Sequence, residues 1–263
     1  MSIQHIGLGR RRFLFGAIPA ICAAQNRPAA RTEYIGRAGF PSEVKAQLDR
    51  LGDRLVKPGK ERTILQGIFV DATSAQSPAQ VVYQLPDRFR FQATGPLNRI
   101  VVFDGETPRS TRAQVDSAEE DLLESFLADS PDGFFDDLRS GAALRLLGRR
   151  FRPGPSIVPD YKGPLFDIYE LAGVVRIRRD RRSRVKRFYF DSASAFLLRV
   201  RYEDVSRGPK VSIETRFSQW RDFAGNPLPG QLERWENGKL VFAFRVASAD
   251  LLPRGDEGIF RTP

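Results

Sequence analysis

The sequence predicts a mainly β protein with some α-helix, folded as a half-open, curved antiparallel β-barrel that a lid of amphipathic helices closes. Three observations carry this prediction. Most apolar runs alternate with a period of two, so that one face is apolar or aromatic and the other carries Arg, Gln, Glu and Ser. Short turn-rich connections join these runs, which favours antiparallel hairpins in one sheet. A segment with helical period interrupts them in the middle of the chain.

The first 24 residues are predicted to be a signal peptide of the twin-arginine type. The stretch Gly9-Arg10-Arg11-Arg12-Phe13-Leu14-Phe15 contains paired arginines followed by Phe-Leu. The apolar run that follows is long enough for a signal core but too short to cross a bilayer. Small residues at Cys22-Ala23-Ala24 predict cleavage after Ala24. We therefore expect a periplasmic or otherwise exported protein.

A lipid anchor at Cys22 is the less favoured alternative, because the bulky Ile21 directly precedes the cysteine. Residues 25–40 are rich in Arg, Pro, Ala and Gly and show no period, which is typical of a linker. The remaining pattern predicts one domain over residues 41–253.

The first expected element is a helix capped by Ser42 and ended by Pro58-Gly59. Alternation then predicts strands over 63–71, 79–85, 88–93 and 99–103. Asp104-Gly105 is a hairpin signal after the last of these.

The helical middle begins with Ser117 and Glu120, which are expected to form a capping box. Ser130-Pro131 starts a second helix, which Gly141 ends, and 142–147 is predicted to be a short third helix. These helices are apolar on one side, so they must cover another part of the protein. We expect them to cover the concave face of the sheet.

Strand patterns then continue to the end of the domain, over 165–177, 184–190, 196–203, 210–223, 228–236 and 239–247. In the third of these, Leu198 and Val200 are expected to face the interior, and Leu197 the outside. Asn237-Gly238 predicts a two-residue hairpin, and Gly225-Asn226-Pro227 another turn.

Several stretches resemble the periplasmic lipoprotein-carrier family (LolA, LolB and their relatives). Leu85-Pro86-Asp87-Arg88-Phe89 looks like the family's Pro-containing turn into a strand, and Val102-Phe103-Asp104-Gly105-Glu106 like its "DG" hairpin. Phe188-Tyr189-Phe190-Asp191 with Leu197-Leu198-Arg199 resembles the strand-turn-strand after its lid. Phe217-Ser218-Gln219-Trp220-Arg221-Asp222 with Gly225 and Leu228-Pro229 resembles a run common in lipoprotein-sorting-like proteins. The resemblance implies a half-open barrel with a helical lid and a hydrophobic ligand such as a lipid or lipoprotein acyl chain.

The candidate ligand-binding residues are apolar side chains predicted to point into this barrel. They are Val81, Tyr83, Phe89, Phe91, Phe103, Phe188, Phe190, Leu198, Val200, Ile213, Phe242 and Phe244 from the strands, with Leu123, Phe126, Phe134 and Phe135 from the lid. Burying methylene groups stabilises a bound acyl chain without any specific polar contact. Two alternatives stay open at this stage: a ligand cavity, or a solid core in a lipid-sensing or regulatory module that binds another protein.

Residues 176–187 contain eight basic side chains in twelve, and the whole chain has a net charge of +10. The arginines Arg178, Arg179, Arg181, Arg182 and Arg184 are candidates for docking to an anionic membrane surface or an acidic envelope protein. Nucleic acid is not expected as a partner, because export removes the chain from DNA and no aromatic residue interleaves the cluster. A solvated hairpin tip is the alternative.

Catalysis is not expected. The single His, Cys and Met of the chain all lie within the predicted signal peptide. A mature chain would therefore lack Ser-His-Asp triads, Cys nucleophiles, disulfides and zinc sites built on His or Cys. The carboxylates Asp132, Asp136 and Asp137 fall in a predicted helix, where negative charge in the first turn favours the helix dipole. We predict no catalytic residue, no metal and no cofactor.

Overall fold

The computed structural model describes residues 42–55, 61–112, 114–152, 163–174, 183–205 and 210–263. The predicted signal peptide and linker, and the candidate docking residues Arg178, Arg179, Arg181 and Arg182, lie outside these ranges. The described residues belong to one compact unit. Its described helices include none that is long and apolar enough to cross a membrane.

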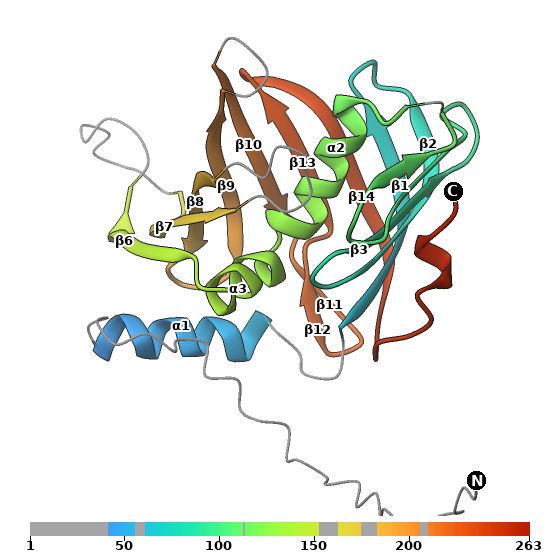
Figure 1. Cartoon of the computed structure of the whole chain (residues 1–263). Helices are drawn as coiled ribbons and strands as arrows, with labels where there is room; N and C mark the ends of the chain where they lie inside the picture. Colours follow the sequence, from blue (N-terminus) through green and yellow to red (C-terminus); the bar gives the residue numbers. More distant parts are fainter. Residues whose placement is uncertain (1–41, 56–60, 113, 153–162, 175–182, 206–209) are drawn as a thin grey trace, which may run out of the picture. The chain divides into compact units, whose positions relative to one another are not determined.

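A single curved antiparallel sheet forms the main layer of this unit (Figure 1). Its twelve strands lie in the order β5-β4-β3-β2-β1-β14-β13-β10-β9-β8-β7-β6, so the two edges never meet and the barrel stays open. The first group of strands comprises β1 (Arg62–Asp71), β2 (Gln76–Gln84), β3 (Arg88–Ala93), β4 (Arg99–Phe103) and β5 (Pro108–Ser110). The second comprises β6 (Ala143–Phe151), β7 (Phe166–Val174), β8 (Ser183–Asp191), β9 (Leu197–Asp204), β10 (Val211–Ser218), β13 (Gln231–Glu236) and β14 (Lys239–Leu252). The predicted fold class is confirmed.

The long strand β14 joins the two groups, since it pairs with β1 on one side and β13 on the other. A β-bulge in the β1–β14 pair falls at Gly67. A Cβ at this position would collide with the carbonyl oxygen of Arg245, so only glycine allows the two backbones to approach this closely. The bulge bends the sheet where its two halves meet.

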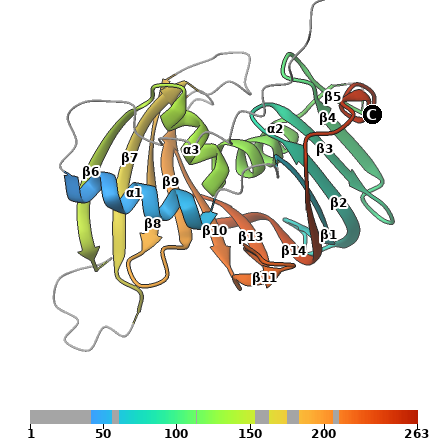
Figure 2. The ribbon, with the colours of Figure 1, turned by 90° about the horizontal axis from the view of Figure 1, so that it is seen from below.

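The lid consists of α2 (Ser117–Leu123), the π-helical turn η1 (Glu124–Ala128) and α3 (Pro131–Arg139). Figures 1 and 2 show these helices crossing the concave side of the sheet, as predicted. The capping box lies one residue earlier than predicted: Asp116 caps the helix and pairs with Glu119. Ser130 caps α3 by accepting a hydrogen bond from the Gly133 amide, which confirms the predicted start.

The first helix, α1 (Ser42–Leu55), contacts α3 and β12. Its Leu48 and Leu51 are buried in the core. The α1 helix therefore packs against both the lid helix α3 and the β11–β12 hairpin.

The prediction of a third helix over 142–147 was wrong, because these residues begin β6. Leu144 and Leu146 pack against the core while Arg145 points outward to the carboxylate of Glu170 on β7. This two-residue alternation, together with pairing to β7, outweighs the good helix propensity of Ala, Leu and Arg.

Strand boundaries differ from the prediction mainly around one hairpin. The expected strands over 210–223 and 228–236 are each interrupted, because β11 (Arg221–Phe223) and β12 (Asn226–Leu228) form a separate two-stranded sheet. Ala224 and Gly225, both with positive φ, form its turn. Asn237 and Gly238, also with positive φ, confirm the predicted two-residue turn between β13 and β14.

The last ten residues fold back on the outer face of β3. Arg90 donates hydrogen bonds to the carbonyl oxygens of Ile259 and Thr262, and Arg88 contacts Glu257. Phe260, in the short helix η2 (Gly258–Phe260), is completely buried. The compact unit therefore includes residues beyond 253.

This C-terminal anchor yields a stability prediction. Phe260→Ala should lower the free energy of unfolding by about 3–5 kcal/mol, because it leaves a cavity under the C-terminal segment. Leu252→Ala, at a side chain that is 41% exposed, is the control and should cost less than about 1 kcal/mol. Denaturant titration of both variants measures the difference, and equal losses would contradict the packing of Phe260 on β3.

Candidate functional site

The candidate site is the concave face of the sheet beneath the lid. Of the sixteen predicted interior residues, all except Leu198 are buried in one continuous core. The buried residues are Val81, Tyr83, Phe89, Phe91, Phe103, Leu123, Phe126, Phe134, Phe135, Phe188, Phe190, Val200, Ile213, Phe242 and Phe244. Their position in the interior is as predicted, whereas ligand binding by any of them stays a prediction.

Leu198 was assigned to the wrong face. A register shift between β8 and β9 pairs Phe190 with Leu197 and Tyr189 with Arg199, which leaves Leu198 as the extra residue of a bulge. Leu197 consequently enters the core with no exposed surface. An inserted residue reverses the alternation on one side of it, and no periodic pattern reveals where the insertion falls.

Two clusters of aromatic rings attach the lid to the sheet. Phe126 of η1 lies 5.9 Å from Phe89 and 5.7 Å from Phe244, measured between ring centroids. Phe134 of α3 lies 4.8 Å from Phe188 and 5.2 Å from Phe190. Each pair contributes on the order of 1 kcal/mol in addition to the free energy gained by burying its apolar area.

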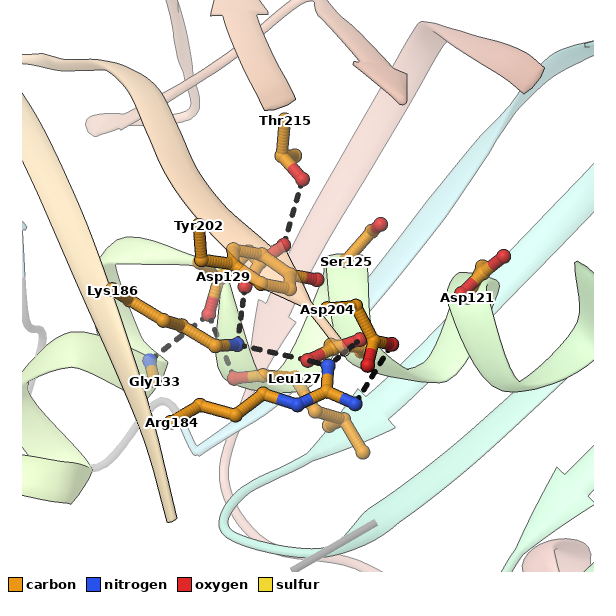
Figure 3. A network of polar contacts seen from close by, with 12 residues as sticks. Asp121, Ser125, Leu127, Asp129, Gly133, Arg184, Lys186, Tyr202, Asp204 and Thr215 are labelled. Carbon is orange, nitrogen blue, oxygen red and sulfur yellow. Dashed lines mark hydrogen bonds and ion pairs between the residues drawn. The ribbon is translucent and has the colours of Figure 1, made fainter. Parts of the chain in front are cut away.

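A buried polar network also joins the lid to the sheet (Figure 3). Arg234 of β13, which has no exposed surface, donates hydrogen bonds to Asp121 of α2 and to the hydroxyl oxygen of Tyr202. Its guanidinium also lies 3.7 Å from Glu124 and 3.8 Å from Asp129. Burial works to lower the pKa of Arg234, but Tyr202 and these carboxylates raise it well above its ordinary value. The group therefore stays charged.

Two further cations on β8 complete the network. Arg184 donates to Glu124 of the lid and to Asp204 of β9, each at 2.9 Å. Lys186 contacts Asp129 at 2.5 Å and Glu124 at 3.2 Å. Burial acts to lower the pKa of Lys186, but Asp129 and Glu124 outweigh it and raise the pKa.

Arg184 is therefore not an exposed docking residue, and that part of the docking prediction was wrong. Its side chain is 7% exposed and points to the concave face, on the same side of β8 as Phe188 and Phe190. Sequence reasoning assigned it to the surface because it belongs to a run of basic residues. The signal that could have corrected this is parity, since Arg184 and Lys186 alternate in phase with the buried aromatics of their strand.

A small apolar pocket opens from this core between the lid and the β11–β12 hairpin. Its floor consists of core side chains from the sheet and lid: Leu65, Tyr83, Phe126, Phe217, Leu232 and Val246. Its rim consists of Ser130, Pro131 and Asp132 of α3 with Trp220, Pro227, Leu228 and Pro229 of the hairpin segment. The free volume is about 40 Å³, room for a few water molecules and too little for an acyl chain.

The hairpin segment of the rim is held by its tryptophan. The indole of Trp220 stacks on Phe196 at 4.5 Å and donates a hydrogen bond to the carbonyl oxygen of Leu197. The three other rim residues of the hairpin, Pro227, Leu228 and Pro229, are half-buried. Sequence reasoning placed this segment in the wall of the barrel without identifying it as the mouth of a pocket.

One carboxyl group faces the pocket. Burial raises the pKa of Asp132 to about 6, against the lowering effect of Arg139 and with a further increase from Asp136. On the opposite wall, the hydroxyl of Tyr83 is hydrogen-bonded to Thr63, and burial and the charge of Asp132 raise its pKa. No metal-binding group of His, Cys, Asp and Glu occurs among the described residues.

Comparison with solved structures identifies the fold as LolA-like. A LolA superfamily protein from Nitrosomonas europaea superimposes with a TM-score of 0.53 and 11% sequence identity, over 83% of this chain and 97% of that one. A domain from Vibrio parahaemolyticus, described as an outer membrane lipoprotein-sorting protein domain, gives a TM-score of 0.52 and 8% identity, over 82% and 95%. A DUF1329 family protein from Desulfovibrio piger gives 0.52 and 12%, over 83% and 97%. No family model and no curated protein matches the sequence.

The buried network yields a second stability prediction. Arg234→Met should lower the free energy of unfolding by about 3–5 kcal/mol, because it leaves buried carboxylates without this cation. The control is Arg216→Met, whose 41% exposed side chain pairs with Glu214 on the outer face and should cost about 0–1 kcal/mol. Thermal and denaturant unfolding measure both, and a small loss for Arg234→Met would contradict its role in attaching the lid.

The raised pKa of Asp132 predicts how stability depends on pH. The folded protein holds this proton up to about pH 6, whereas the unfolded chain releases it near 3.8, so stability falls as the pH rises between these values. Asp132→Asn should therefore raise the free energy of unfolding at pH 7.5 by on the order of 1–3 kcal/mol and flatten this part of the profile. The free energy of unfolding of both proteins, measured from pH 4 to 8, tests this prediction. A pH profile that Asp132→Asn leaves unchanged would contradict it.

Proposed function

We propose that the protein is an exported, non-enzymatic binding protein of the cell envelope that holds a hydrophobic ligand, a lipid or lipoprotein acyl chain, between the lid and the sheet. The observation that carries the proposal is the apolar pocket that leads from the hairpin rim to the aromatic core. The LolA-like fold supports it, as does the predicted signal peptide. Lipoprotein sorting is the specific role that this combination favours.

Ligand binding requires the lid to move, because the pocket holds only about 40 Å³ of free volume. An acyl chain gains about 0.8 kcal/mol for each methylene group that it buries. A chain of ten or more methylenes therefore gains on the order of 8 kcal/mol, enough to offset separation of a few lid contacts. The rings of Phe126 and Phe134 would then exchange contacts with the sheet for contacts with the ligand.

The polar network makes such a movement feasible. If the lid were attached by apolar surface alone, lifting it would expose all of that surface to water. The charged groups of Glu124, Asp129 and Arg234 instead regain hydration when they separate, which recovers much of the desolvation cost of burying them. The lid is thus strongly attached where it is aromatic and reversibly attached where it is ionic.

Docking through surface arginines is part of the proposal, with fewer residues than the sequence predicted. Arg178, Arg179, Arg181 and Arg182 remain candidates for contact with an anionic membrane surface or an acidic envelope protein, without Arg184. No cofactor is needed for a carrier of this kind. Catalysis is likewise not part of this proposal.

A second function is favoured by one observation. The core is nearly filled by its own side chains, with lid rings in direct contact with sheet rings. A lipid-sensing or regulatory module that binds another protein through its surface would need no cavity. The two functions differ in one measurable respect, since a carrier takes up hydrophobic probes and a solid module does not.

Uptake of a hydrophobic probe tests the carrier function. The mature protein should bind a neutral fluorescent dye such as Nile red, and native mass spectrometry should detect copurified lipid. Val246→Phe fills the pocket floor and should weaken binding at least about tenfold, whereas Val185→Phe, on the outer face at 52% exposure, should leave it unchanged. No uptake by the unmodified protein would favour the solid module.

A further inference from the structure

The pocket is apolar apart from a few groups, and one of them is ionisable in the neutral range. Of the described residues that line it, Asp132 alone carries a charge. The other polar side chains are the hydroxyls of Tyr83 and Ser130 and the indole N–H of Trp220. Ser130 is engaged with Gly133 and Leu127, Trp220 with Leu197, and Tyr83 with Thr63. The carboxyl of Asp132 is thus the polar group that a ligand at the rim would meet.

The charged neighbours of Asp132 do not neutralise it. On its own helix, Asp136 adds negative charge and Arg139 adds positive charge, but these two pair with each other at 3.5 Å. On the hairpin, Arg221 donates a hydrogen bond to the carbonyl oxygen of Val246 and stacks over Phe223, and it is not among the lining residues. On β2, Tyr83 presents a hydroxyl.

The position of Asp132 in the first turn of α3 favours its charged form through the helix dipole. Burial acts in the opposite direction and raises the pKa of this carboxyl. The charged form of a buried carboxyl group is stabilised when a cation approaches it. It repels an anion for the same reason.

We propose that this pocket selects the head group of its ligand, and that it takes an amphiphile with a cationic amine head in preference to one with a carboxylate head, through Asp132. An alkyl chain would extend over the floor residues Phe126 and Leu232 towards the core, and its ammonium group would lie at the rim beside Asp132. An uncharged hydroxyl head is accommodated with intermediate affinity, since it can donate a hydrogen bond to the carboxylate. This inference rests on the proposed function and specifies the class of ligand.

Three probes with the same chain test the selectivity: dodecylamine, dodecanol and dodecanoate, each used below its micelle concentration to displace Nile red at pH 7.5. Dodecylamine should bind at least about tenfold more tightly than dodecanoate, with dodecanol between them. The preference should shrink as the pH falls below about 6, because Asp132 then becomes neutral.

Variants assign the effect to one carboxyl group. Asp132→Asn should remove most of the preference for the amine, and Asp132→Lys should reverse the order in favour of dodecanoate. The matched control is Asp136→Asn, which removes a carboxylate from the same helix outside the lining and should keep the preference. Circular dichroism and Nile red binding show whether each variant is folded and still takes up an apolar probe.

The results separate this inference from the function on which it rests. If dodecanol and the dye bind but the preference for the amine is absent, or survives Asp132→Asn, the head-group inference is overturned and the carrier function stands. If neither the dye nor any of the three probes binds, both fall. A tenfold preference that disappears with Asp132→Asn and survives Asp136→Asn supports the inference.

Discussion

The structure depends on one buried cation. Arg234 lies at the centre of the sheet, contacts the lid through Asp121, Glu124 and Asp129, and has no access to water. A guanidinium in such a place is tolerable only if carboxylates surround it, so its burial requires acidic residues on the lid segment that faces it. The lid is therefore positioned by charge pairing, whereas the aromatic clusters supply the apolar contact area.

The division of the interior into aromatic and charged residues explains which parts of the fold could be predicted from the sequence. Alternation in runs such as residues 88–93 locates the strands and their buried face, because every second residue is aromatic. The same rule applies to Arg184 and Asp204, but there the inward residues are charged, and charge is normally a sign of exposure. These residues can be recognised as interior only if their partners across the core are known. The partner of Arg184 is Glu124, which lies 60 residues away in the sequence. Pairing of that kind is a tertiary property.

The local errors have the same origin. Leu198 was placed inside because a bulge has no signature in a single strand, and 142–147 was read as a helix because its residues suit both structures. In each case, hydrogen bonding to a neighbouring strand decides the conformation. The hairpin turn at Asn237-Gly238 and the helix start at Ser130-Pro131 were predicted correctly because both depend on local chemistry. The turn requires residues with positive φ, and the helix start requires a capping side chain. Local sequence signals therefore predict most helices and strands, whereas long-range pairing determines which residues lie in the interior.

Burial of charge also governs how tightly a carrier of this design could bind. If the closed lid is the stable state, the apparent affinity for a ligand falls in proportion to the fraction of molecules with an open lid. An opening free energy of about 2.7 kcal/mol would reduce the affinity roughly a hundredfold, yet the ligand would still be held once bound. A stronger ionic network gives slower exchange and weaker capture, and a weaker one gives the opposite. In a carrier of the proposed kind, the number of ion pairs between lid and sheet would thus set the balance between holding a hydrophobic cargo and releasing it.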